Sequence, residues 1–138
     1  MIKVNLSSVF YCSVNVVEQM INKRIKGVII NISSISANGN ADQSAYSAAK
    51  AGVNALTAVW SRELGAFGIR TASIAPGFFE TESTHKALND KIIEKIKSEI
   101  PLRKLGKPEE LAKAVRFIIE NDYFNGKILE LDGGMVLS

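Results

Sequence analysis

The sequence predicts an α/β protein built on three parallel strands with flanking helices, and two observations support this prediction. Short runs of β-branched residues alternate with long segments of helical periodicity along all 138 residues. The chain also opens on a helix, so the first predicted strand has no neighbour on one side and leaves a bare sheet edge. We therefore interpret residues 1–138 as one partial domain, half of a larger doubly wound sheet.

The helices are predicted from apolar residues spaced three and four positions apart. Residues 4–26 form the first helix, which Gly27 is expected to end, and residues 44–67 form an alanine-rich, proline-free second helix. An amphipathic helix is predicted over 86–100. The helix over 108–120 begins with a proline and two glutamates, which suit a helix N-terminus.

The strands are predicted from short apolar runs that polar or turn residues end. Residues 28–32 form a β-branched run, residues 69–75 precede the breaker pair Pro76-Gly77, and residues 128–131 precede an Asp-Gly-Gly turn. Continuous apolar runs of this kind are typical of parallel strands that are covered on both faces.

Composition excludes several classes of function. The net charge of +3 comes from lysines and arginines spread along the chain, so no nucleic-acid partner is predicted. One cysteine and one histidine supply neither a disulfide nor a zinc site, and Cys12 is expected to be a buried apolar residue. No segment approaches the roughly 18 apolar residues of a membrane helix, and no signal peptide is recognised, so we expect a cytoplasmic protein without a membrane partner.

Tyr46 and Lys50 are the sharpest chemical feature of the sequence. Four residues separate them, so both side chains lie on one face of the second predicted helix. A phenol ionises at about pH 10, and a neighbouring ammonium brings its pKa toward the range of a general acid or base. The spacing alone also suits a solvated surface pair.

Two strand ends add context to this pair. Ser33 and Ser34 follow the first predicted strand, at the end of a parallel sheet where ligands bind. A hydroxyl there could hydrogen-bond a substrate oxygen beside Tyr46. The second strand ends in the rigid turn 75–81, so two strand ends and a helix start are expected to converge on one crevice.

Five motifs in this order resemble the short-chain dehydrogenases/reductases, and the nearest likeness is to the 3-oxoacyl-acyl-carrier-protein reductase type. The resemblance extends over essentially the whole chain. It implies the catalytic, C-terminal half of a Rossmann-type sheet and an NAD(P)-dependent oxidoreductase that interconverts a ketone and a secondary alcohol by hydride transfer. The motifs are Asn5-Leu6-Ser7-Ser8, Asn31-Ile32-Ser33-Ser34, Tyr46-x-x-x-Lys50, Pro76-Gly77-Phe78-Phe79-Glu80-Thr81 and Asp132-Gly133-Gly134.

The resemblance also implies catalytic roles for four residues. Tyr46 would donate or accept the proton, and Lys50 would lower its pKa while bonding the nicotinamide ribose. Ser34 would orient the substrate carbonyl. Asn5 would hold the water that links Lys50 to solvent in a proton relay.

The implied cofactor is NAD or NADP, which supplies the hydride chemistry itself. Its nicotinamide would lie against Pro76, Gly77 and Phe79, with the Phe79 backbone bonding the carboxamide. Thr81 would sit near the cofactor's amide or phosphates. No metal is implied.

Two counts give different answers for the catalytic serine. Thirteen residues back from Tyr46, a common spacing in the family, stands Ser33, whereas strand register from Gly27 gives Ser34 with a loop one residue shorter. We prefer Ser34, because a slip by one residue would turn the side chain to the opposite face of the strand, and loops absorb deletions readily.

The family's Gly-x-x-x-Gly-x-Gly turn, whose following helix binds the cofactor pyrophosphate, does not occur in this sequence. We therefore expect the nucleotide-binding half to be absent and cofactor binding by this chain to be impaired. A truncated, inactive remnant or an assembly partner is the alternative to an enzyme. The resemblance implies a homo-oligomer, a dimer or tetramer formed through the two long helices and the last strand.

Overall fold

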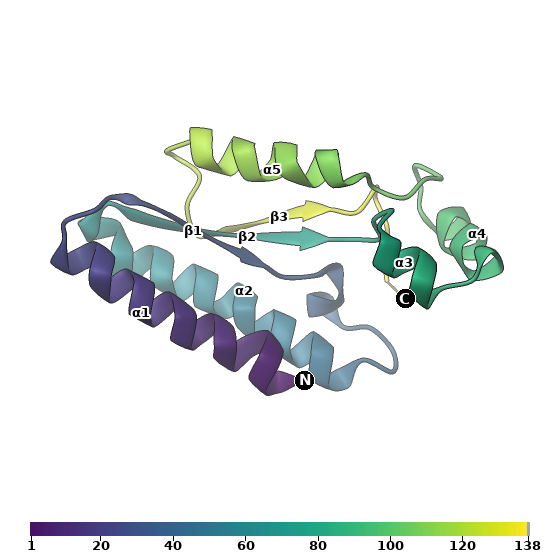
Figure 1. Ribbon diagram of the computed structural model, residues 1–138, viewed down its shortest axis with the longest axis horizontal. Coiled ribbons are helices and arrows are strands. Elements are labelled where there is room, and N and C mark those ends of the chain that lie inside the picture. Colours follow the sequence, from purple (N-terminus) through teal and green to yellow (C-terminus); the bar gives the residue numbers. More distant parts are fainter. Residues whose placement is uncertain (138) are drawn as a thin grey trace.

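The computed structural model describes residues 1–137, with only the backbone at Ser83, and contains one three-stranded parallel sheet (Figure 1). Its strands are β1 (Gly27–Ile32), β2 (Ile69–Pro76) and β3 (Lys127–Leu131), in the spatial order β1-β2-β3. The register pairs Gly27 with Ile69 and Ala72 with Lys127. The three predicted strands and the open edge at β1 are therefore confirmed.

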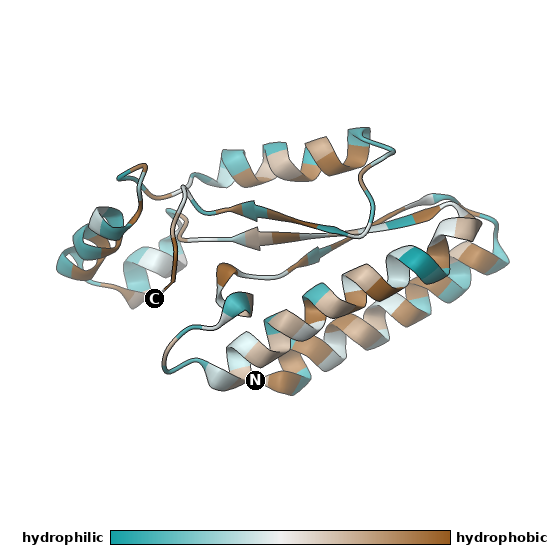
Figure 2. Cartoon of the chain, turned by 180° about the vertical axis from the view of Figure 1, so that it is seen from behind, coloured by the Kyte–Doolittle hydropathy of each residue, from teal (hydrophilic) through white to brown (hydrophobic). Residues whose placement is uncertain are grey.

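Helices cover both faces of this sheet (Figure 1). Helices α1 (Ser8–Asn22) and α2 (Ser44–Leu64) lie on one face, and α5 (Pro108–Glu120) lies on the other. Alternate strand residues point to opposite faces, so each helical layer has its own apolar core. Figure 2 shows the apolar residues as brown bands along these helices. The α2 core contains Trp60, Leu64 and Ile69, and the α5 core contains Ala72, Ile74, Ala114 and Ile118.

The single helix predicted over 86–100 is wrong, because two shorter helices occupy this region. They are α3 (Glu82–Ala87) and α4 (Asp90–Glu99). The Asn89 side chain accepts a hydrogen bond of 2.9 Å from the backbone nitrogen of Ile92 and so begins α4 as an N-cap. A capping residue inside an amphipathic pattern starts a new helix, and the apolar spacing alone does not show it.

The first helix differs from the prediction at both ends. A π-helical turn, η1 (Lys3–Ser7), precedes α1, and the helix ends at Asn22, before the predicted Gly27. The reason is that Arg24 takes a left-handed conformation, with φ of 55°. The backbone nitrogen of Ile25 then donates to the carbonyl of Met20 at 2.8 Å, which closes a Schellman motif. Gly27 is the first residue of β1.

Cys12 is exposed, which contradicts the expectation that it is buried. It lines an open groove between α1 and the free edge of β1, together with Val16 and Ile30. An apolar sequence run therefore marks a surface that no element of residues 1–137 covers.

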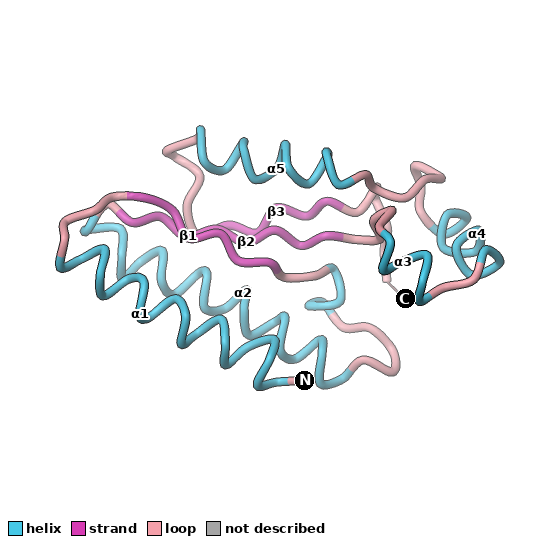
Figure 3. The backbone as a smooth tube through the Cα atoms, in the orientation of Figure 1, coloured by secondary structure: helices cyan, strands magenta, loops and turns pink. Residues whose placement is uncertain are grey.

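The carboxyl ends of the strands lie at the same end of the sheet, where loops lead to the first turns of α2 and α3 (Figure 3). The loop after β1 contains the 3₁₀ helix η2 (Ile35–Asn38). The first turn of α2 is thereby brought beside the ends of β1 and β2.

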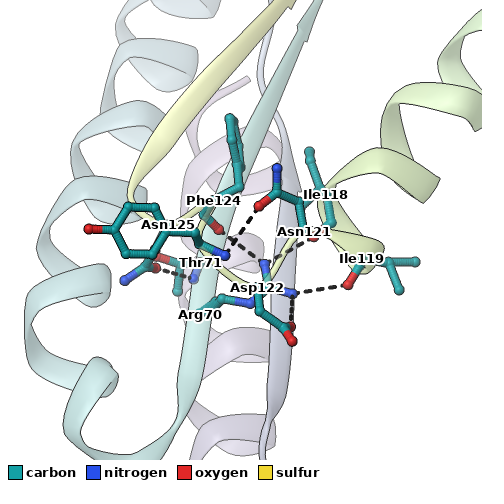
Figure 4. A network of polar contacts seen from close by, with 9 residues as sticks. Arg70, Thr71, Ile118, Ile119, Asn121, Asp122, Phe124 and Asn125 are labelled. Atoms are coloured by element: carbon teal, nitrogen blue, oxygen red, sulfur yellow. Dashed lines mark hydrogen bonds and ion pairs between the residues drawn. The ribbon is translucent and has the colours of Figure 1, made fainter.

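Arg70 ties α5 to the opposite end of the sheet (Figure 4). Its guanidinium donates to the carbonyls of Ile118 and Phe124, each at 3.0 Å, and of Ile119 at 3.1 Å. The side chain is 15% exposed, whereas its ion-pair partner Asp122 is 99% exposed. The carbonyls at the end of a helix lack helical donors, so this cation satisfies them.

We expect Arg70→Met to lower the free energy of unfolding by about 2–3 kcal/mol, because these charge-assisted hydrogen bonds are lost. Asp122→Asn is the matched control and should change stability little, since an exposed ion pair contributes little. Urea unfolding measures both variants. Equal losses for the two would show that the ion pair, and not the carbonyl contacts, carries the stability.

Candidate active site

A cavity of about 540 Å³ opens at the carboxyl ends of the strands. It brings together four of the predicted site residues, which come from the end of β1, the start of α2 and the end of β2: Ser34, Tyr46, Pro76 and Gly77. The predicted convergence of strand ends and helix start is thus present in the structure.

Lys50 lies beside Tyr46, one turn further along α2. Its Nζ is 5.7 Å from the centroid of the Tyr46 ring and donates a hydrogen bond of 2.8 Å to the carbonyl oxygen of Ile32. The residue is 8% exposed, and burial lowers the pKa of Lys50 from its ordinary value. An ammonium has three protons, so this hydrogen bond leaves two for a ribose hydroxyl or water.

The position of Tyr46 in α2 adds a second favourable field. Tyr46 lies in the first turn of a helix that runs from Ser44 to Leu64. The positive end of the helix dipole is at this turn and stabilises negative charge there. The helix N-terminus and the Lys50 ammonium therefore both place positive charge near Tyr46.

The two serines point to different surroundings. Ser33 is 3% exposed, and its Oγ donates to the carbonyl of Lys50 at 3.2 Å. Ser34 lines the cavity, and its Oγ accepts a hydrogen bond of 3.1 Å from the backbone nitrogen of Ser36. A hydroxyl that accepts in this way keeps its own proton for another oxygen. Of the two serines, Ser34 is therefore the one that lines the cavity, and its catalytic role stays a prediction.

Asn5 lies outside the cavity, in the π-helical turn η1. It lines the groove of about 400 Å³ beside β1, and Lys50 lines the same groove. A Cβ at Gly52 would lie 2.9 Å from Cδ1 of Leu6, so glycine allows η1 to approach α2 closely. Turns of this π-helical kind occur frequently at functional sites. Lys50 therefore borders the groove that Asn5 lines and also lies beside the Tyr46 ring.

Phe79 and Thr81 do not line the cavity. Phe79 forms a parallel bridge with Gly106, and its carbonyl accepts from Oγ1 of Thr84 at 2.7 Å. Thr81 Oγ1 accepts from the backbone nitrogen of Thr84 at 3.2 Å and caps α3. Their predicted contacts with a cofactor stay predictions.

Sequence reasoning did not select several residues that line the cavity. Phe78, the neighbour of the chosen Phe79 in the segment after β2, is the phenylalanine that lines the cavity. The polar loop before α2 contributes the rest. Its position between a strand end and a helix start is the signal that could have found it, and its members are Asn40, Asp42 and Gln43.

The residues present fit one end of a nicotinamide dinucleotide. Tyr46 and Lys50 offer donors for a ribose, and Pro76 and Gly77 line the same cavity as Tyr46. Within residues 1–137, no glycine-rich turn leads into a helix to hold a pyrophosphate. The same range has no group of three His, Cys, Asp or Glu side chains placed to hold a metal. Of its helices, none has the length and apolar character needed to span a bilayer.

Comparisons with known proteins agree with this fold. Residues 1–136 match the family model described as Enoyl-(Acyl carrier protein) reductase. The chain therefore belongs to the short-chain dehydrogenase/reductase family. It is 43% identical to the 3-oxoacyl-acyl-carrier-protein reductase FabG of Thermotoga maritima, covering 99% of this chain and 56% of that protein. It is 40% identical to the human (3R)-3-hydroxyacyl-CoA dehydrogenase, covering 99% of this chain and 53% of the relative.

Solved structures show the same Rossmann-type fold. The 3-hydroxyacyl-CoA dehydrogenase type-2 from Mycobacterium avium matches with a TM-score of 0.92 at 31% identity, over 99% of this chain and 55% of that one. A 4-hydroxyisoleucine dehydrogenase mutant complexed with NADH and succinate matches with a TM-score of 0.91 at 32% identity, over 98% and 57%. The chain spans about half the length of the relatives it matches.

Proposed function

We propose that this chain carries the catalytic half of an NAD(P)-dependent oxidoreductase that interconverts a ketone and a secondary alcohol. The observation that carries the proposal is that Ser34 and Tyr46 line one cavity while the Lys50 ammonium lies beside the tyrosine ring. The relatives named above are reductases and dehydrogenases, which supports the same chemistry.

In the proposed reaction the side chains orient the substrate and move one proton. Ser34 donates its free hydroxyl proton to the substrate oxygen and holds it beside Tyr46. Tyr46 gives its phenolic proton to that oxygen during reduction and takes it back during oxidation. Lys50 stabilises the phenolate by its charge. The groove that Asn5 and Lys50 share would then return a proton from solvent through water.

A nicotinamide cofactor, NAD or NADP, would supply the hydride when bound. Tyr46, Lys50, Pro76 and Gly77 would hold its nicotinamide and ribose, with Phe79 and Thr81 as further proposed contacts. The test of the function is removal of the phenolic proton by Tyr46→Phe in a form of the protein that turns over a carbonyl substrate. The alternative role, an inactive assembly partner, predicts that no form of the protein turns over a carbonyl substrate.

Association through α1 and α2 is proposed for the enzyme and for the inactive partner alike. Large apolar side chains of both helices are exposed beside the partly open groove that Trp60 lines. An apolar surface of this kind is typical of an interface between proteins. It suits a second copy of this chain, and the exposed residues are Phe10, Tyr11, Val14 and Val59.

We expect Val14→Glu to convert a dimer or tetramer into monomers, because it places a charge in the apolar interface. Tyr123→Glu is the matched control, since Tyr123 is fully exposed in the loop after α5 and lies outside this surface. Sedimentation velocity of the two variants and the parent chain measures the effect. A parent chain that sediments as a monomer would contradict the proposed association.

A further inference from the structure

Reciprocal hydrogen bonds join the end of β1 to α2 at Lys50. The hydroxyl of Ser33 donates to the carbonyl of Lys50 at 3.2 Å, and the ammonium of Lys50 donates to the carbonyl of Ile32 at 2.8 Å. Both side chains are buried. Strand and helix thus each supply a donor and an acceptor to the other.

This junction continues into a buried polar network between the sheet and α2. Asn31 donates from Nδ2 to Oγ1 of Thr57 at 3.0 Å, and Thr71 donates from Oγ1 to the carbonyl of Thr57 at 2.7 Å. Ser73 donates from Oγ to the carbonyl of Asn31 at 3.3 Å. Buried polar groups that are all bonded specify one arrangement of the elements they join.

Helix α2 does not need the Ser33 hydroxyl in order to form. The carbonyl of Lys50 lies inside the helix, where the backbone nitrogen four residues later is its regular donor. A carbonyl oxygen has a second lone pair, and Ser33 occupies it. The additional bond therefore fixes the position of the Lys50 turn relative to the strand. It affects the placement of the helix more than its stability.

We propose that Ser33 is a positioning residue. Its hydroxyl holds the Lys50 turn of α2 against the end of β1, so that the Lys50 ammonium stays hydrogen-bonded to the Ile32 carbonyl beside Tyr46. The adjacent serines then have separate tasks, because Ser34 faces the cavity and Ser33 faces α2. The catalytic meaning of this placement rests on the proposed function. The placement itself can be measured without turnover.

The measurement is the pH titration of the Lys50 side-chain NMR signal, assigned with Lys50→Arg. Burial lowers the pKa of Lys50. If the Lys50 turn moves away from β1, the ammonium becomes more exposed and the midpoint of its pH titration rises. We expect Ser33→Ala to raise it by about half a pH unit or more. Ser33→Thr keeps a hydroxyl and should restore the parent midpoint. Tyr46 beside Lys50 and Cys12 in the same groove are ionisable as well, and both are kept in every variant.

Ser73→Ala is the matched control, since it removes another buried serine hydroxyl that bonds a backbone carbonyl, and that carbonyl, of Asn31, belongs to β1 and not to α2. It should lower the melting temperature and leave the Lys50 midpoint in place. If Ser33→Ala behaves in the same way, Ser33 is only structural and the proposal is overturned.

Two further outcomes are also decisive. If Ser33→Ala does not fold, Ser33→Cys, which keeps the volume with a weaker donor, should raise the midpoint by a smaller amount; an unmoved midpoint then overturns the proposal. Full turnover by Tyr46→Phe would overturn the proposed function. The conclusion drawn from the Lys50 titration in the Ser33 variants would still stand. The two failures are therefore distinguishable.

Discussion

Tyr46→Phe is expected to lower kcat by about 10²–10⁴-fold in any form of the protein that turns over a carbonyl substrate. The substitution keeps the ring, its packing and its distance from Lys50, and removes only the proton and the oxygen that carries it. The Ser34 hydroxyl remains to bind the substrate oxygen. KM for the substrate should therefore change little while kcat falls.

Tyr123→Phe is the matched control, since this tyrosine is exposed and lies outside the cavity. It should retain the parent kcat within about twofold, as is usual for surface substitutions. The measurement is the absorbance of the reduced cofactor during turnover. A Tyr46→Phe variant with near-parent kcat would rule out the tyrosine as the acid/base.

The 138-residue chain by itself is expected to show no saturable binding of NADH at micromolar concentrations. Affinity for a dinucleotide depends strongly on the pyrophosphate, which binds at a helix N-terminus behind a glycine-rich turn. Residues 1–137 contain the proposed contacts for the nicotinamide and ribose but no such turn. The contacts at one end of the ligand must then offset the whole free-energy cost of immobilising it.

Fluorescence titration of NADH tests this expectation, with the 4-hydroxyisoleucine dehydrogenase mutant that has been solved in complex with NADH as the positive control. Addition of the chain should leave the NADH emission unchanged beyond dilution. A saturable signal with a micromolar Kd would show that the nicotinamide end of the site suffices, and would contradict the expectation.

The sequence by itself determined the strands, most of the helices and the Tyr46–Lys50 pair. These features depend on local periodicity: β-branched runs form strands, and residues four apart share a helical face. It missed the division between α3 and α4, because the capping of α4 by Asn89 interrupts an otherwise regular apolar pattern. Apolar character likewise predicted burial for Cys12, although exposure depends on which elements cover it.

Only the tertiary structure decided how the site residues divide between surfaces. In the structure Ser34 lines the cavity, whereas the Ser33 side chain points to α2. Asn5 lies in a separate groove that Lys50 also lines. The spacing between a serine and Tyr46 cannot settle this, because the loop between them varies in length. The direction of a side chain at a strand end follows from the packing of that strand on α2, which is a contact between segments distant in sequence.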